Sequence, residues 1–200
     1  GIFGGKPGIN SEGISLAVNG MFSINDDFAR FEKPFHLRCY EVLRSNNIEK
    51  AFEALTNTPR SCTANFILGH GPSRVVDIEL APDSFQLIDT NNGILSHANH
   101  INDQGLLGVK EPPNPRRHLS EFRQKRMNDL LTDGKPLDIQ DLQNILKDHH
   151  HEPHSLCRHR DNSLVEFQHT ITKTAVIMDL SDNKIWLTNG QPCKSEFREY

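Results

Sequence analysis

The sequence lacks the features that mark several protein classes. No apolar run approaches the roughly 20 residues that a membrane-spanning helix requires, no charged and then apolar leader opens the chain at Gly1, and no Asn-x-Ser/Thr site occurs. These absences favour a cytoplasmic setting and no membrane partner. The 200 residues with a net charge of −4 predict a single domain over 1–200 and no nucleic-acid partner.

Cysteine is scarce and widely spaced. The four cysteines are Cys39, Cys62, Cys157 and Cys193, and no two form a CxxC pair. This spacing indicates neither a small disulfide scaffold nor a zinc ribbon. We therefore expect four free thiols that serve packing.

One segment, residues 148–159, is rich in histidine and suggests a metal site. His154, Cys157 and His159 could supply three ligands to zinc, provided that the segment is extended so that Cys157 and His159 share a face. The sequence shows no second group of ligands. We therefore expect no metal and no cofactor, and a zinc-binding module remains an alternative.

Apolar periodicity predicts alternating groups of strands and helices. Strands are expected at 14–18, 62–68, 74–80, 85–88, 94–97, 172–180 and 185–188, and helices in two pieces over 34–58, at 118–131 and after Asp138. Residues 105–117 are proline-rich and are expected to form a surface connection. Basic residues at 116–126 are interpreted as a solvated helix face, because no aromatic side chains alternate with them.

Two asparagines stand at the ends of expected strands. Asn99 lies in a polar run, Ser96-His97-Ala98-Asn99-His100, and Asn19 precedes Gly20. An Asn amide can donate an N–H to a developing oxyanion without depending on a protonation state. The alternative is that both residues serve turns and local backbone groups.

The order of motifs resembles one family. The blocks GINSEGISLAVNG, SHANH, FRQKRMNDLL, DHHHEPHSLCRH and TAVIMDLSDNKIWLTNGQPC look like the acyl-coenzyme A:6-aminopenicillanic acid acyltransferase family, also classed as C45 peptidases, within the N-terminal-nucleophile (Ntn) hydrolases. The resemblance covers essentially the whole chain. The choloylglycine hydrolases, more distant kin, share the GINSEG block and the strand-ending Asn.

This resemblance implies an α+β fold, a four-layer αββα sandwich. It also implies cleavage or transfer of an acyl group at an amide bond by a Cys that self-cleavage of a precursor frees as an N-terminal residue. The thiol would attack while the α-amine, which titrates near pH 8, accepts its proton. Asn19 and Asn99 match the two asparagines that hold the oxyanion in such enzymes.

The chain departs from the family pattern at its start. In this family the nucleophilic Cys lies upstream of the GINSEG block, so we expect that Gly1 begins after it and that the N-terminal part of the sandwich is missing. None of the four cysteines matches the nucleophile. Possible supporting residues are His97, Ser155, Arg158 and His169.

The expected partners follow from the resemblance. They are a small N-acyl amide or an acyl-CoA or other thioester substrate, together with the N-terminal portion of the protein's own precursor. Hydrolysis and acyl transfer share an acyl-enzyme, so the sequence does not separate them. The alternative function is that of a catalytically inactive, truncated family member that binds a partner or has a structural role.

Overall fold

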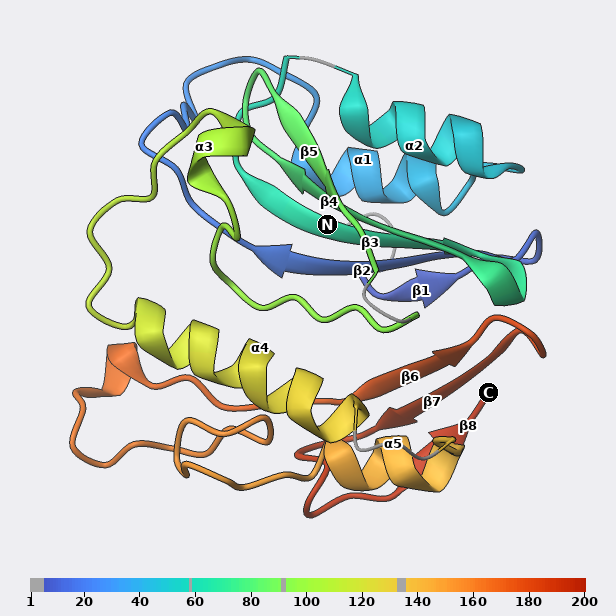
Figure 1. The fold of residues 1–200 in the computed structure, drawn as a ribbon, viewed down its shortest axis with the longest axis vertical. Helices are drawn as coiled ribbons and strands as arrows, with labels where there is room; N and C mark the ends of the chain where they lie inside the picture. Colours follow the sequence, from blue (N-terminus) through green and yellow to red (C-terminus); the bar gives the residue numbers. More distant parts are fainter. Residues whose placement is uncertain (1–5, 58, 91–92, 133–135) are drawn as a thin grey trace.

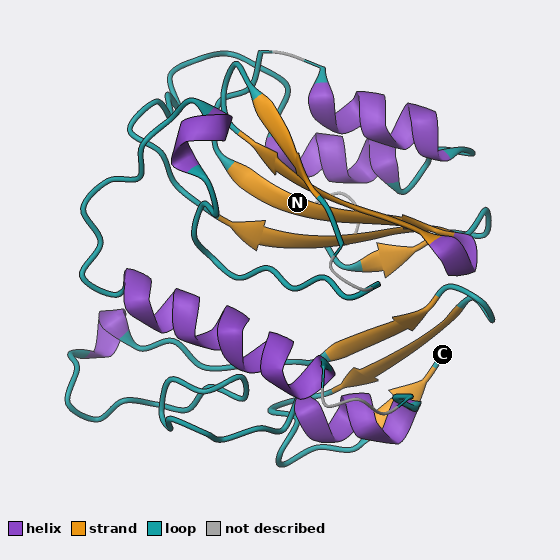
Figure 2. Ribbon diagram, viewed as in Figure 1, coloured by secondary structure: helices purple, strands orange, loops and turns teal. Residues whose placement is uncertain are grey.

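The computed structural model describes residues 6–57, 59–90, 93–132 and 136–200, which form two antiparallel sheets with helices outside both (Figures 1 and 2). The first sheet has the order β1-β2-β3-β4-β5, with β1 Gly8–Ile9, β2 Ile14–Gly20, β3 Ala64–His70, β4 Arg74–Leu80 and β5 Phe85–Ile88. The second has the order β6-β7-β8, with β6 Val176–Asp179, β7 Lys184–Thr188 and β8 Phe197–Glu199.

Helices α1 (Phe35–Val42) and α2 (Ile48–Thr56) cover the outer face of the first sheet. Asn47 begins α2 by accepting a hydrogen bond from the backbone N–H of Lys50 at 2.9 Å. Alternate residues of β3, such as Phe66 and Leu68, are buried against these helices. The apolar core of the molecule lies between this helix pair and the sheet.

The other face of the first sheet carries polar side chains in one row across three strands. Asn19 on β2 pairs in register with Asn65 on β3, which pairs with Glu79 on β4, and Asp77 follows two residues away on the same face. Asn65, Asp77 and Glu79 are completely buried. Because side chains of a strand alternate between faces, this row is directed away from α1 and α2, toward the second half of the chain.

Helices α4 (Arg117–Leu131) and α5 (Ile139–Ile145) belong to the second half and lie, with the second sheet, on the opposite side of the first sheet from α1 and α2 (Figure 1). Asp138 and Asp141 form a capping box that begins α5. The order of layers is helix, sheet, sheet, helix, with α5 on the outer side of the second sheet and α4 beside that sheet (Figure 1), which confirms the predicted αββα sandwich.

Several local predictions were wrong. Residues 94–97 are not a strand, because Ile94 makes only an isolated bridge and the following residues form an irregular loop. Strand β8 was not predicted. The connection at 105–117 starts inside a short helix, α3 (Gln104–Leu107), which the Asp103 side chain caps at the Leu106 N–H. The sequence also predicts a turn at Asn91-Asn92-Gly93 and a helix end at Gly134, and residues 91–92 and Gly134 lie outside the described residues.

Other elements match their predictions within a few residues at each end. These are both pieces of the 34–58 helix pair, helix 118–131, strand 14–18 and the hairpin that Ser181, Asp182 and Asn183 close. Among the described residues, no helix combines the length and apolar character needed to cross a membrane.

Candidate active site

Asn19 lies near the end of β2 with its side-chain amide held inside the molecule. Its Nδ2 donates to Asn65 Oδ1 at 3.0 Å and to the backbone carbonyl of His97 at 3.2 Å. An amide nitrogen carries two hydrogens, so these contacts use both. Asn19 thereby ties β2 to the loop that contains the second asparagine.

Asn99 lies in that loop, and its side chain reaches back to the end of β2. Its Nδ2 donates to the carbonyl of Gly20 at 3.1 Å, and its Oδ1 accepts from Arg123 Nη2 at 2.8 Å. The backbone N–H of Asn99 donates to Ser120 Oγ at 2.7 Å. Asn99 is exposed, and these contacts leave its amide one N–H for a further acceptor.

The two asparagines line the same pocket, which has a volume of about 160 Å³. Besides Asn19 and Asn99, its lining consists of His97, Ala98, Arg123, Gln124, Met127, Leu146 and Leu156. A neighbouring pocket of about 280 Å³ shares Asn99 and Arg123 with it. The structure thus brings together the two asparagines that the sequence placed far apart, at the junction of two hollows.

His97 connects the loop that contains Asn99 to strand β4 of the first sheet. Its side chain is completely buried, with Nε2 at 2.7 Å from Glu79 Oε1 and Nδ1 at 2.9 Å from the carbonyl of Ala98. Burial alone would lower the pKa of His97, but the hydrogen bond to Glu79 and the charge of Asp77 outweigh it and raise the pKa. With an acceptor at each ring nitrogen, His97 fits the protonated form.

Glu79 and Asp77 complete this buried network. Glu79 also accepts from the backbone N–H of Asn102 at 2.8 Å, which holds the far end of the loop. Asp77 accepts from Asn65, and burial raises the pKa of Asp77 to about 6. The sequence of β4, with acidic residues at alternate positions of a buried strand, contains this signal, which the prediction of a strand at 74–80 does not use.

The neighbouring pocket is basic. Arg116, Arg123 and Arg158 line it, and no carboxylate is among its described lining residues. Burial, with the charge of Arg158, lowers the pKa of Arg123 to about 10, and burial also lowers the pKa of Arg158. Three guanidinium groups around one hollow favour an anionic ligand.

The prediction that the basic residues at 116–126 form a solvated helix face was therefore wrong for some of these residues. Arg116 and Arg123 line the basic pocket, and Arg126 donates to Asp148 at 2.6 Å. Only an exposed pair such as Lys125 with Asp129, at 2.7 Å, fits the solvated face. The helix has basic residues on more than one side, and the presence of basic residues in the sequence does not show which side each one occupies.

The remaining predicted supporting residues differ in position. Arg158 lines the basic pocket, where its Nη1 donates to Thr170 Oγ1 at 3.0 Å. Ser155 is fully buried and donates to the carbonyl of Cys157 at 2.7 Å, and it lines neither pocket. His169 adjoins Thr170, outside the described lining of both pockets.

None of the four cysteines is among the described lining of either pocket. Cys39 is buried in the core between α1 and the first sheet, where burial raises the pKa of its thiol to about 11. A thiol with such a high pKa is a poor nucleophile near neutral pH. That none of the four cysteines is the nucleophile stays a prediction.

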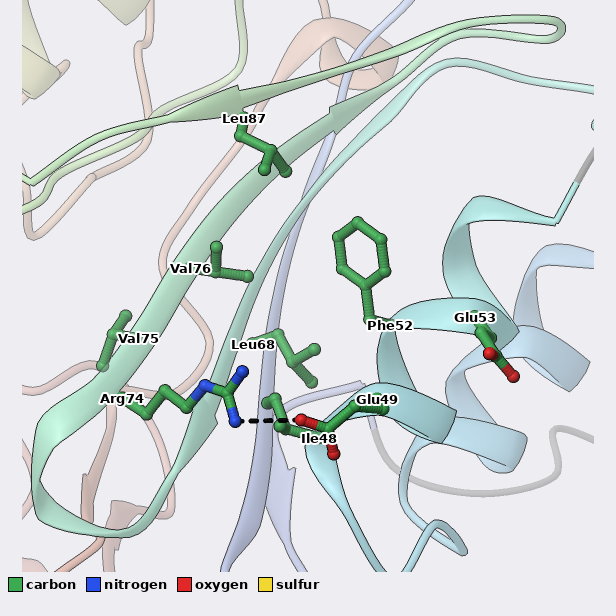
Figure 3. A pocket seen from close by; sticks show the side chains of 9 residues that line it. All are labelled: Ile48, Glu49, Phe52, Glu53, Leu68, Arg74, Val75, Val76 and Leu87. Carbon is green, nitrogen blue, oxygen red and sulfur yellow. Dashed lines mark hydrogen bonds and ion pairs between the residues drawn. The ribbon is translucent and has the colours of Figure 1, made fainter.

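A larger cavity of about 600 Å³ lies elsewhere, between α2 and strands β4 and β5 (Figure 3). Its lining is mainly apolar, with Phe52, Val76 and Leu87 directed toward one another across it. Arg74 and Glu49 form an ion pair at 3.0 Å beside it. It contains neither asparagine and no candidate nucleophile, so it is not the candidate active site.

The sequence matches a family model over most of its length. The model of the acyl-coenzyme A:6-aminopenicillanic acid acyl-transferase family matches residues 1–194. The chain belongs to this family. The predicted resemblance is confirmed, and membership of the acyl-transferase family supports an enzyme of the Ntn type that acts as an acyltransferase or amide hydrolase.

A solved structure of another protein has a similar fold. A variant of conjugated bile acid hydrolase from Clostridium perfringens superposes with a TM-score of 0.58 at 12% identity, covering 98% of this chain and 76% of that chain. This similarity shows that the chain has the Ntn hydrolase fold. Comparison with curated proteins found no significant match.

Proposed function

We propose that the protein cleaves or transfers an acyl group at the amide bond of small N-acyl compounds, through an acyl-enzyme on a cysteine. That cysteine is supplied by residues outside 1–200 and is freed as an N-terminal residue by self-cleavage of a precursor. Its thiolate attacks the carbonyl carbon, the C–N bond breaks, and the amine leaves with a proton. Water or an acceptor amine then takes the acyl group from sulfur.

The observation that carries this proposal is the shared pocket of Asn19 and Asn99. The tetrahedral intermediate places a negative charge on the former carbonyl oxygen, and a fixed N–H donor stabilises it. A neutral amide supplies such a donor at every pH. The pocket also has an apolar wall, with Met127, Leu146 and Leu156, for an acyl chain.

The geometry supports different roles for the two asparagines. Asn99 keeps one amide N–H beyond its bond to Gly20, so Asn99 is the proposed direct donor to the oxyanion. Asn19 spends both amide hydrogens on Asn65 and His97, so in this arrangement it fixes the loop that presents Asn99. The predicted role of Asn19 as a second donor would require one of these bonds to open.

The basic pocket supports a substrate with an anionic group. The cluster of Arg116, Arg123 and Arg158 lines the basic pocket, which shares Asn99 with the asparagine pocket. One small molecule could therefore place its carboxylate or phosphate in the basic pocket and its reacting carbonyl beside Asn99. An N-acyl amino acid has this combination of groups. An acyl-CoA has it too, and there the thioester C–S bond would break and CoA would leave as a thiol. Both belong to the predicted substrate classes.

The test measures self-cleavage and turnover of the protein expressed from its full coding sequence. Mass spectrometry should find a fragment that begins with Cys, and the protein should hydrolyse N-acyl amino acids faster than the same compounds with the carboxylate amidated. Asn99→Ala should lower kcat on the order of 100-fold or more, as expected for the loss of one oxyanion donor.

Asn102→Ala is the matched control, because Asn102 is exposed in the same loop, lines neither pocket, and bonds Glu79 through its backbone N–H, which alanine keeps. It should keep its activity. A fully active Asn99→Ala protein would overturn the role of Asn99. An uncleaved wild-type protein that is inactive on every N-acyl compound would favour the alternative, a non-catalytic family member.

A further inference from the structure

Four side chains outside the candidate active site bring their donor atoms together. They are His149, Cys157, His159 and Cys193, and these atoms all lie within 4.8 Å of one another. His159 Nε2 is 3.0 Å from His149 Nε2, 3.7 Å from Cys157 Sγ and 3.5 Å from Cys193 Sγ. Two imidazoles and two thiols thus surround one point.

The three separations from His159 Nε2 are close to those of a tetrahedral zinc site. Zinc bonds of about 2.0 Å to nitrogen and about 2.3 Å to sulfur, at tetrahedral angles, separate two nitrogens by about 3.3 Å and nitrogen from sulfur by about 3.5 Å. The three measured distances fall close to these values. The donors also suit the metal, since thiolates and imidazoles favour zinc over the harder cations.

The chain positions the four donors with local backbone bonds. The N–H of Cys157 donates to the carbonyl of Asp148 at 3.0 Å, which brings Cys157 beside His149. Cys193 belongs to a turn after β7, closed by the Lys194 N–H and the Gln191 carbonyl at 2.9 Å. Gln191, in the same turn, donates from its side-chain Nε2 to the carbonyl of Arg158 at 3.1 Å, which joins this turn to the segment that contains Cys157 and His159.

We propose that His149, Cys157, His159 and Cys193 bind one Zn²⁺ as a structural Cys₂His₂ site. Four protein ligands fill a tetrahedral shell, so no position remains for a substrate or a reactive water. Two thiolates balance the charge of the ion, and binding releases the two thiol protons. The zinc links the loop at 148–159 to the segment that follows β7.

The site supports the candidate active site mechanically. Leu156 and Arg158, the neighbours of Cys157, line the asparagine pocket and the basic pocket respectively. Fixing Cys157 and His159 therefore fixes two wall residues of these pockets. This part of the inference rests on the proposed function, whereas metal binding itself does not.

The ligand set differs from the one that the sequence suggested. His154 is not among the four donors, because its Nε2 faces Asp161 Oδ2 at 3.0 Å. His149 and Cys193 take part instead. Cys193 lies far along the chain, and no local spacing connected it with the histidine-rich segment.

The test measures metal in the reduced protein, expressed from its full coding sequence and purified without chelator. Elemental analysis should find about one zinc per chain. After the zinc is removed, Co²⁺ should bind with the visible absorption of a tetrahedral thiolate site. Chelation should lower the Tm by about 5 °C or more, because the metal binds only the folded form.

His149→Gln is the decisive variant, since this side chain is exposed and its loss leaves the core intact. Loss of a residue that merely supports a ligand weakens metal binding by about 10–100-fold, so loss of this ligand should weaken it more than 100-fold. His150→Gln, the exposed neighbour outside the donor set, should keep its zinc and its response to chelator.

Three results would overturn the proposal. One is reduced protein that carries no transition metal and takes up neither Zn²⁺ nor Co²⁺. Another is a disulfide between Cys157 and Cys193 in protein handled without oxidant. The third is equal zinc affinity in the His149→Gln and His150→Gln proteins. Metal content is measured without substrate, so these results do not depend on whether the proposed enzymatic activity is correct.

Discussion

The two halves of the molecule are built alike but are stabilised differently. Each has one antiparallel sheet and two principal helices, and the first half also contains the short helix α3. In the first half, one apolar cluster joins α1, α2 and the first sheet, and Ile14, Leu16, Leu55, Leu68 and Ile78 within it are inaccessible to solvent. Among the described residues from 117 to 200, the buried apolar residues are Ile145, Cys157, Ala175, Ile177 and Pro192.

Polar contacts hold the second half instead. Arg126 joins α4 to Asp148, and the Thr188 hydroxyl accepts from the N–H of Ala175 at 2.9 Å. Small apolar cores contribute little free energy, and proteins with such cores commonly rely on metals or disulfides. The cluster of two histidines and two cysteines lies in this half, where a metal would compensate for the small core.

The largest expected effect tests the core of the first half. Phe66 is 1% exposed and packs on Phe35 with ring centroids 5.4 Å apart, so Phe66→Ala should lower the free energy of unfolding by about 3–5 kcal/mol. Ile177→Ala in the second sheet, at 8% exposure, should cost only about 2 kcal/mol. Equilibrium urea unfolding measures both, and equal costs would contradict the comparison.

The next effect concerns the buried ion pair of Glu79 and His97. This pair lies next to the loop that contains Asn99, on the face of the first sheet that is directed toward the second half. Breaking a buried pair typically costs about 3–5 kcal/mol, so Glu79→Gln should lower stability by about 3 kcal/mol at pH 6. The folded-state pKa of His97 is raised above its unfolded value near 6.5. Its contribution is therefore complete below about pH 6.5 and is lost as the pH rises through the folded pKa.

The measurement is urea unfolding of wild type and Glu79→Gln between about pH 5.5 and pH 9. The stability gap between the two proteins should narrow as the pH rises, and taking the difference removes titrations that both share. A gap that stays constant over this pH range would mean that Glu79 does not hold a proton on His97 in the folded state. A gap of zero throughout would remove the pair as an anchor of the loop.

The smallest expected effect tests whether exposed ion pairs stabilise the second half. Lys125 and Asp129 form an exposed i,i+4 pair on α4, with side chains 76% and 52% exposed. Solvent screens such a pair, so Asp129→Asn should change the free energy of unfolding by less than about 0.5 kcal/mol. A larger loss in thermal or urea unfolding would show that α4 depends on its surface charges.

The sequence predicted what depends on local pattern. The α1–α2 pair follows from apolar periodicity and the Asn47 cap, and β2, β3 and β4 follow from β-prone runs between turn residues. The strand expected at 94–97 failed because its β-prone residues have no full partner strand, and the polar row on the first sheet holds the loop instead. β8 was missed because three residues give too little pattern.

The sequence by itself determined the family, the layered fold and the two asparagines, because residue type and motif order suffice for these. Only the tertiary structure decided which side chains meet. It placed the Asn99 side chain against Gly20 and brought Arg123 and Arg158 to one pocket. It also grouped His149 and Cys193, rather than His154, with Cys157 and His159. These contacts join segments far apart in the chain, and their distances follow from sheet pairing and loop paths that no local pattern encodes.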